Sequence, residues 1–294
     1  QKIRERVESL GVKIQEGDIQ LNQKLYEQQF SLQNNFEKGV DIRKTLVIAS
    51  TPRCGSHFLG HALHQTGQFG FPLEYANPLN VERWKSIFNV KSFDKVLDGV
   101  KENRTSPNGI FSIKVHCSHL EQFGGFGGLI SKVPNPHFIL LTRRNLLKQA
   151  VSLSIARQTG VWISGQEAKS RDVSYNASDI EFCLKRTILH NAMWKFLLSS
   201  NSIPYIEVIF ENARKDLNGT VRSIADFLNI DIVDEQLPGL PTTKKQSDSI
   251  NEEWIQRYIS EDVKSSFIDI ENILEPKNFK KKGLTLLANV FKAR

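Results

Sequence analysis

Two short segments of this 294-residue chain carry side chains that are suited to binding anions. The first, Thr51-Pro-Arg-Cys-Gly-Ser56, follows an apolar run at 45–50 and precedes a helical pattern. A short loop that leads into a helix offers backbone N–H groups and the positive end of the helix dipole to an anion, and Arg53 adds a permanent charge. The same residues also suit an ordinary turn in which Gly55 makes the corner, so this segment alone leaves both interpretations open.

The second segment, Thr142-Arg-Arg-Asn-Leu-Leu-Lys-Gln-Ala-Val-Ser152, follows another apolar run. Ser152 lies eight residues after Arg144, so a helix that begins near Asn145 returns it about two turns later on a nearby face. A guanidinium fork together with a hydroxyl suits a phosphate monoester, although a solvent-exposed helix start is the alternative for any single arginine. Taken together, the two segments predict a ligand with two separate anionic groups.

Both segments belong to an alternation of strand and helix patterns. Four near-continuous apolar runs are typical of buried parallel strands: 45–50, 110–115, 137–142 and 205–210. Helical patterns lie between and after them, at 58–63, 146–157, 179–198 and 220–228. This order predicts an α/β fold with a P-loop-like central parallel β-sheet flanked by helices, whose ligands bind beyond the carboxyl ends of the strands. We expect the glycine-rich segment 124–128 to be a flexible loop.

Residues 1–44 differ from the rest of the chain. Apolar residues recur there at helix-compatible spacing among polar ones, at Val7, Leu10, Ile14, Leu21 and Leu25. We therefore expect an N-terminal helical extension over 1–44, docked on the core or on a partner, followed by one α/β domain over 45–294.

Composition excludes several classes of protein. The chain is 39% hydrophobic and 24% charged, which excludes a disordered protein, and its apolar runs are too short for a membrane span. A net charge of +7 favours an anionic ligand, but no basic–aromatic groove pattern indicates a nucleic-acid partner. The scattered Cys54, Cys117 and Cys183 predict neither a disulfide framework nor a metal site. Because residues 1–22 also lack a signal-peptide core, we expect a cytoplasmic protein.

The loop at 51–57 resembles the 5′-phosphosulfate-binding loop of sulfotransferases, and Arg143 or Arg144 with Ser152 resembles their 3′-phosphate motif. Between about 45 and 262 the chain resembles, more narrowly, the bacterial trehalose 2-sulfotransferase family. The further matching stretches are Gly70-Phe-Pro-Leu-Glu-Tyr75, Thr105-Ser-Pro-Asn-Gly-Ile110, Gln149-Ala-Val-Ser-Leu153, Gln158-Thr-Gly-Val-Trp162, Gln246-Ser-Asp248 and Glu253-Trp-Ile-Gln-Arg-Tyr258.

This resemblance implies a donor, 3′-phosphoadenosine 5′-phosphosulfate (PAPS), and transfer of its sulfuryl group to a hydroxyl of a small molecule, most probably a carbohydrate or glycolipid, without a metal. It implies two groups of donor-binding residues: Arg53, Cys54, Gly55, Ser56 and His57 for the 5′-phosphosulfate, and Arg143, Arg144 and Ser152 for the 3′-phosphate. Arg53 would also stabilise charge on the leaving oxygen. Relatives in this family suggest a homodimer.

Two alternatives remain at this point. A nucleotide-dependent kinase on a similar sheet lacks its main support, because G-x-x-x-x-G-K-[ST] is absent from the chain. A non-catalytic nucleotide-binding or scaffold protein gains some support from His57, which stands where relatives usually have Thr, whereas Cys54 in place of Ser changes little.

Two residues are candidates for the base that accepts the proton of the acceptor hydroxyl. The resemblance indicates Glu74, whose pKa would have to be raised by burial among Phe69, Phe71 and Tyr75 for efficient catalysis near neutrality. Lys114-Val-His116 instead resembles the Lys-x-His of cytosolic small-molecule sulfotransferases, in which that histidine is the base. We favour Glu74, and expect Lys114 to stabilise charge on the transferring group under either assignment.

Overall fold

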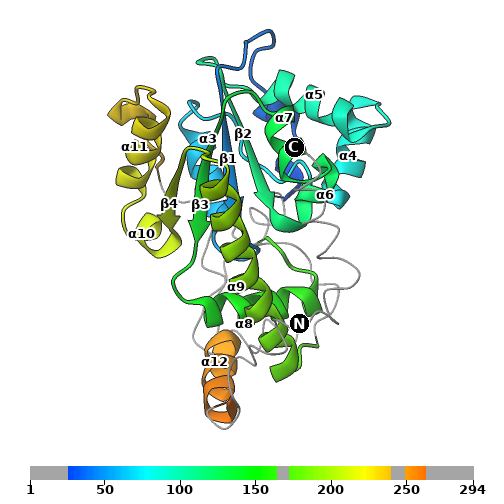
Figure 1. Ribbon diagram of the computed structural model, residues 1–294, viewed down its shortest axis with the longest axis vertical. Coiled ribbons are helices and arrows are strands. Elements are labelled where there is room, and N and C mark those ends of the chain that lie inside the picture. Colours follow the sequence, from blue (N-terminus) through cyan, green and yellow to red (C-terminus); the bar gives the residue numbers. More distant parts are fainter. Residues whose placement is uncertain (1–25, 164–171, 240–248, 263–294) are drawn as a thin grey trace, which may run out of the picture.

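The computed structural model describes residues 26–163, 172–239 and 249–262. Its centre is a four-stranded parallel sheet in the order β2-β1-β3-β4 (Figure 1). The strands are β1 (Lys44–Ser50), β2 (Ile110–His116), β3 (Pro136–Thr142) and β4 (Tyr205–Ile209). Each agrees with a predicted strand to within one residue at either end, so the α/β prediction is confirmed.

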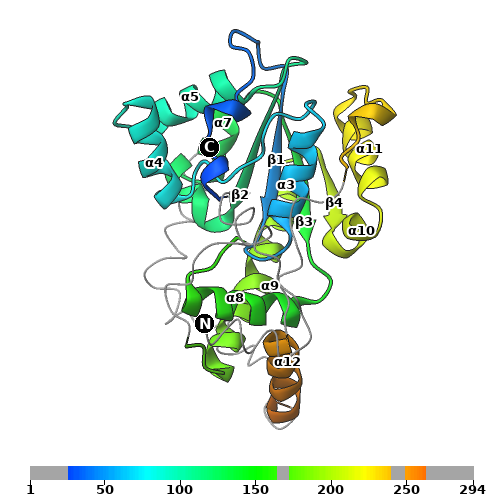
Figure 2. The same cartoon turned by 180° about the vertical axis from the view of Figure 1, so that it is seen from behind.

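Helices cover both faces of this sheet. Alternate residues of β1 enter two different cores, Val47 and Ala49 on one face and Leu46 and Ile48 on the other. The first core includes Trp194 of α9 (Ala177–Ser200), and the second includes Leu59 and Leu63 of α3 (Ser56–Gln65). Figures 1 and 2 show these two helices on opposite sides of β1. Burial on both faces explains why the strands read as continuous apolar runs.

The remaining elements surround the sheet and its carboxyl edge. They are η1 (Leu32–Asn34), α4 (Pro78–Phe88), α5 (Phe93–Arg104), η2 (Cys117–His119), α6 (Leu120–Phe123), α7 (Phe126–Lys132), α8 (Leu146–Thr159), α10 (Phe210–Lys215), α11 (Leu217–Leu228), η3 (Asp234–Gln236) and α12 (Ser249–Asp262). In Figure 1, α8 lies below the carboxyl ends of the strands and α12 lies beyond it. None of the described helices is long and apolar enough to cross a membrane.

The prediction of a flexible loop at 124–128 is wrong. Gly124 and Gly125, with φ of 77° and 106°, form a tight corner between α6 and α7, and Gly127 and Gly128 lie inside α7. A Cβ atom on Gly128 would lie 1.8 Å from the carbonyl oxygen of Phe123. The glycines are therefore explained by close packing at a helical corner, which a count of glycines does not distinguish from a loop.

The expected helices at the amino terminus lie largely outside the described residues, as do Gln246-Ser-Asp248. The segment that is described, from Tyr26 onward, packs on the domain. Phe30 is 6% exposed, with its ring 5.2 Å from that of Trp84. The fully buried Arg104 donates to the carbonyl oxygens of Gln29, Ser31 and Asn34, at 3.2, 3.0 and 3.2 Å. This segment is thus fixed to the core by a buried cation.

Candidate active site

The loop between β1 and α3 has a backbone that only particular residues tolerate. Gly55 has a φ of 92°, and a Cβ atom at this position would lie 2.1 Å from the ring of Phe210. Arg53 also has a positive φ, of 66°. Gly55 is therefore required both by the left-handed backbone and by the close approach of β4's carboxyl end. Cys54 is fully buried in the core and is not among the described residues that line the cavity, and the buried Ser56 begins α3.

The two segments that we predict to bind anions meet at this loop. Arg53 Nε donates to Ser152 Oγ at 3.0 Å, and Arg143 Nη1 donates to the carbonyl oxygen of Arg53 at 3.2 Å. From α8, Gln149 Nε2 donates to Thr51 Oγ1 at 2.8 Å. Burial, and then the charge of Arg143, lower the pKa of Arg53 to about 10. An anion bound between the two guanidinium groups would relieve both effects.

Arg144 occupies a different position from Arg143. Its side chain is exposed and donates from Nη2 to Asn212 Oδ1 at 3.0 Å, while its backbone N–H donates to Glu211 Oε2 at 2.9 Å. Arg143 and Ser152 line the cavity described next, and Arg144 is not among the described residues that do.

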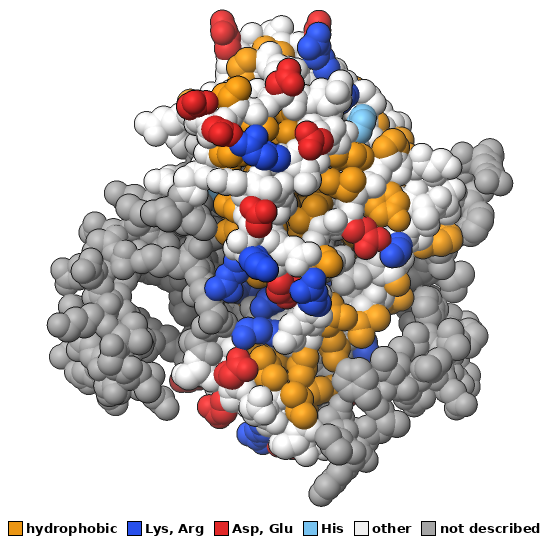
Figure 3. Space-filling model, turned by 90° about the vertical axis from the view of Figure 1, so that its left-hand side faces the viewer, with side chains coloured by type: hydrophobic (Ala, Val, Ile, Leu, Met, Phe, Trp, Pro, Cys, Tyr) orange, Lys and Arg blue, Asp and Glu red, His pale blue; other side chains and the backbone are white. Residues whose placement is uncertain are grey.

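A cavity of about 1410 Å³ lies beyond the carboxyl ends of the strands. Its described lining contains seven Lys or Arg side chains and only two acids, Glu74 and Glu211. The cations are Arg53, Arg143, Lys148, Arg157, Arg186, Arg214 and Lys215. Lys and Arg side chains also gather on the face that carries β4 and α10 (Figure 3). This excess of positive charge suits a ligand with several negative charges.

Glu74 reaches the same cavity through pairing of its own segment with β2. Leu73 forms a parallel bridge with Ile113, and its carbonyl oxygen accepts from the N–H of Lys114 at 2.9 Å. Glu74 Oε1 consequently lies 3.0 Å from Lys114 Nζ and 3.2 Å from His116 Nε2. The structure therefore brings both candidate bases and Lys114 into direct contact.

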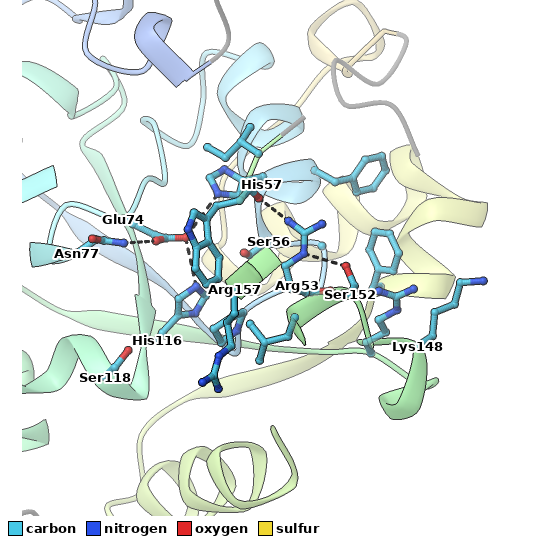
Figure 4. A pocket seen from close by; sticks show the side chains of 18 of the residues that line it. Arg53, Ser56, His57, Glu74, Asn77, His116, Ser118, Lys148, Ser152 and Arg157 are labelled. Atoms are coloured by element: carbon cyan, nitrogen blue, oxygen red, sulfur yellow. Dashed lines mark hydrogen bonds and ion pairs between the residues drawn. The ribbon is translucent and has the colours of Figure 1, made fainter. Parts of the chain in front are cut away.

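Two further side chains hold this carboxylate. Asn77 Nδ2 donates to Glu74 Oε2 at 3.0 Å, and His57 Nε2 lies 3.5 Å from Oε1. Figure 4 shows Glu74 between His57, His116 and Asn77, with Arg53 and Ser152 on the other side of the site. Neither Asn77 nor this role of His57 was predicted, because nothing in the spacing of these residues relates them to Glu74.

The electrostatics of Glu74 differ from the expectation. Burial alone raises the pKa of this carboxyl, but the charge of Lys114 and the contacts with His116 outweigh it, and the pKa lies well below its ordinary value. Phe69, Phe71 and Tyr75 are buried core residues, but the side chains in contact with the carboxylate are polar. The predicted rise is wrong because a buried cation lies at ion-pair distance, which the sequence does not reveal.

His57 and His119 are held in the neutral form. Burial, and then Lys114, lower the pKa of His57 well below its ordinary value, and burial lowers that of His119 to about 3. Buried Nδ1 of His57 has no hydrogen-bond partner among the described residues. Although histidines and a carboxylate gather here, the described part of the chain holds no group of three or more His, Cys, Asp or Glu side chains arranged for a metal ion.

Comparison with known proteins shows that this chain is a sulfotransferase. The chain belongs to the Stf0 sulphotransferase family, whose model matches residues 45–261. The trehalose 2-sulfotransferase of Mycolicibacterium smegmatis is 24% identical over 254 residues, covering 72% of this chain and 93% of the relative. That of Mycobacterium tuberculosis is 24% identical over 260 residues, covering 75% and 96%. The resemblance in the sequence is thereby confirmed.

Among solved structures, a sulfotransferase from Alicyclobacillus acidocaldarius is similar at 14% identity and a TM-score of 0.46. The match covers 75% of this chain and 93% of that one.

Proposed function

We propose that this sulfotransferase moves a sulfuryl group from PAPS to a hydroxyl group of a carbohydrate or a glycolipid. The observation that carries the proposal is the hydrogen bond of Arg53 to Ser152 in a cavity that Glu74 also lines. It joins the two segments with affinity for anions, as a donor with a 5′-phosphosulfate and a 3′-phosphate requires. The carboxylate supplies a proton acceptor beside them.

The loop after β1 would hold the 5′-phosphosulfate through Arg53 and the backbone N–H groups of Gly55 and Ser56. Arg143 and Ser152 would bind the 3′-phosphate, joined by Arg144 when it exchanges its contact with Asn212 for the phosphate. His57 would not bind the phosphosulfate as a hydroxyl side chain at this position would, because its ring faces Glu74.

Lys114 is well suited to stabilising negative charge on the transferring sulfuryl group. Its Nζ lies within ion-pair distance of Glu74 but forms no hydrogen bond among the described residues, and its side chain is fully buried. Lys114 is not among the described residues that line the cavity, so it would act on the sulfuryl group through its charge. Together with Arg53, Lys114 would offset the charge that develops on the transferring group and the leaving oxygen.

In the reaction, the acceptor oxygen forms a bond to sulfur while the bond from sulfur to the bridging oxygen of the 5′-phosphate breaks. The nucleotide leaves with that electron pair, and the hydroxyl proton passes to the base. Glu74 is ionised at neutral pH, and its low pKa means that it accepts the proton late, once sulfur–oxygen bonding has made the hydroxyl acidic. His116, 3.2 Å from the same carboxylate oxygen, is the second candidate.

A carbohydrate acceptor is supported by the side chains that surround Glu74. The cavity lining there includes the uncharged hydrogen-bonding groups of Tyr26, Gln29, Asn77, Asn80 and Ser118. Such groups match sugar hydroxyls, and the two relatives above are named for transfer to a disaccharide. Family membership does not by itself fix the substrate.

The first experiment is calorimetric titration with 3′-phosphoadenosine 5′-phosphate (PAP) beside ADP and ATP, followed by transfer from PAPS to a panel of sugars. We expect tight binding that requires the 3′-phosphate and no magnesium, and a sulfated sugar. Preference for ATP with magnesium would contradict the donor, and PAP binding without transfer to any carbohydrate would contradict the acceptor class.

A further inference from the structure

Arg186 lines the cavity from α9. It belongs to α9, which packs against η2 directly after β2, and it lines the cavity together with Ser118 and His119 of η2. One turn further along α9, the carbonyl oxygen of His190 accepts from Cys117 Sγ at 3.5 Å. Burial and then the charge of Arg186 lower the pKa of His190 to about 4, in keeping with this proximity.

The order of the strands separates this end of the cavity from the donor end. β2 lies on one side of β1, whereas β3 and β4 lie on the other. Arg143, Ser152 and Phe210 follow β3 and β4, on the side of the proposed nucleotide. The segment of Glu74 pairs with β2, and α9, which carries Arg186, packs on η2 directly after β2, so we place the acceptor at this end of the cavity.

Arg186 has no counter-ion within the described ranges. It forms neither a hydrogen bond nor an ion pair there, although its side chain is half-buried. Other cations of the cavity are compensated: Arg157 pairs with Asp179 at 3.4 Å, and Lys148 with Glu252 at 3.1 Å. A partly desolvated charge without a partner is costly, so a ligand that supplies a negative charge would be stabilised here.

Glu74, the acid that lines this end of the cavity, is already engaged. Both oxygens of Glu74 have partners, with Lys114 and His116 at Oε1 and Asn77 at Oε2. Glu74 therefore does not compensate Arg186. A planar guanidinium that faces a cavity binds phosphate, sulfate or carboxylate groups through two parallel hydrogen bonds.

We infer that the acceptor is an anionic carbohydrate, whose phosphate, sulfate or carboxylate group is bound by Arg186 while its hydroxyl faces Glu74. This rests on the proposed function, because it describes the acceptor end of the same cavity. Trehalose, the sugar in the names of the two relatives, is uncharged, so this chain selects a different acceptor from the one those names give.

The test compares trehalose and glucose with trehalose 6-phosphate, glucose 6-phosphate and glucuronate, as ligands of the protein–PAP complex and as acceptors from PAPS. We expect at least one anionic sugar to exceed its uncharged counterpart by about tenfold or more in affinity and in kcat/KM, as for one charged hydrogen-bonded contact. Arg186→Met should abolish this preference. The control is Lys185→Met, because Lys185 is ion-paired with Glu181 and is not among the described lining residues.

The outcomes separate the inference from the proposed function. Equal use of charged and uncharged sugars would overturn the anionic acceptor and leave carbohydrate sulfation intact. If Arg186→Met lowers the affinity for PAP and leaves the preference among sugars unchanged, Arg186 belongs to the donor site. This result would also overturn the inference. PAP binding without binding or sulfation of any sugar would overturn both.

Discussion

The ammonium group of Lys114 lies 3.0 Å from Oε1 of Glu74, and the lysine side chain is completely buried. The two charges therefore depend on each other. We expect the negative charge of a sulfuryl group bound near this pair to offset part of the lysine's charge, which would weaken the effect of Lys114 on the pKa of Glu74. Binding of the proposed donor would thus make the carboxylate a stronger base.

Replacement of the proposed base is the most direct test of this pair. We expect Glu74→Gln to reduce turnover by roughly two to four orders of magnitude, while the affinity for PAP measured by calorimetry changes little. His116→Asn should have a smaller effect on turnover. Full activity in Glu74→Gln would identify His116 as the base.

The 3′-phosphate site makes a second prediction. Arg144→Ala should weaken binding of PAP by about 10- to 100-fold, the worth of a charge-assisted contact, but should hardly change binding of adenosine 5′-phosphosulfate, which lacks the 3′-phosphate. Arg222→Ala is the matched control. Arg222 lies in α11, pairs with Asp234 and is not among the described residues that line the cavity. Equal losses for the two nucleotides would remove Arg144 from this site.

Buried neutral histidines should make the protein sensitive to acid. Burial lowers the pKa values of His61 and His64 to about 4, whereas the same side chains in the unfolded chain titrate near 6.5. Between these values the unfolded chain binds more protons, so the free energy of unfolding should fall as the pH drops from about 6.5 toward 4.

Urea unfolding at pH 7.5 and pH 5 measures this loss. In His61→Leu the difference between the two pH values should shrink, and because buried Nε2 of His61 has no partner among the described residues, no hydrogen bond is lost. An unchanged difference would show that His61 does not titrate as expected.

The buried cation of the amino-terminal segment gives a prediction on stability. Arg104→Met should lower the free energy of unfolding by about 2 kcal/mol or more, because three carbonyl oxygens lose their donor. Arg104→Lys should recover little, since one ammonium group cannot reproduce the fork. Lys95→Met, at an exposed ion pair with Asp98, serves as the control in the same urea titration. Equal effects of Arg104→Met and Lys95→Met would contradict this role.

The sequence predicted the strands and loops that carry the site better than the contacts between its side chains. The strands could be found because burial on both faces leaves continuous apolar runs, and the residues that follow β1 and β3 share the carboxyl edge. The contact of Glu74 with Lys114 could not be found, because it depends on the bridge of Leu73 to Ile113 between segments distant in the chain. Phe210 could have been found by applying the same edge rule to β4, but its packing on Gly55 could not.

The described segment that precedes β1 contributes to the wall of the cavity. The family match starts at residue 45, yet Tyr26 and Gln29 line the cavity. Tyr26 donates its hydroxyl to Asn80 Oδ1 at 3.0 Å, and Asn80 in turn donates to the carbonyl oxygen of Glu74 at 3.0 Å. The region matched by the family model is therefore shorter than the part of the chain that lines the cavity. A chain shortened to residues 45–261 would keep the loop after β1 and lose Tyr26 and Gln29, a part of the cavity wall that we expect to contact the acceptor.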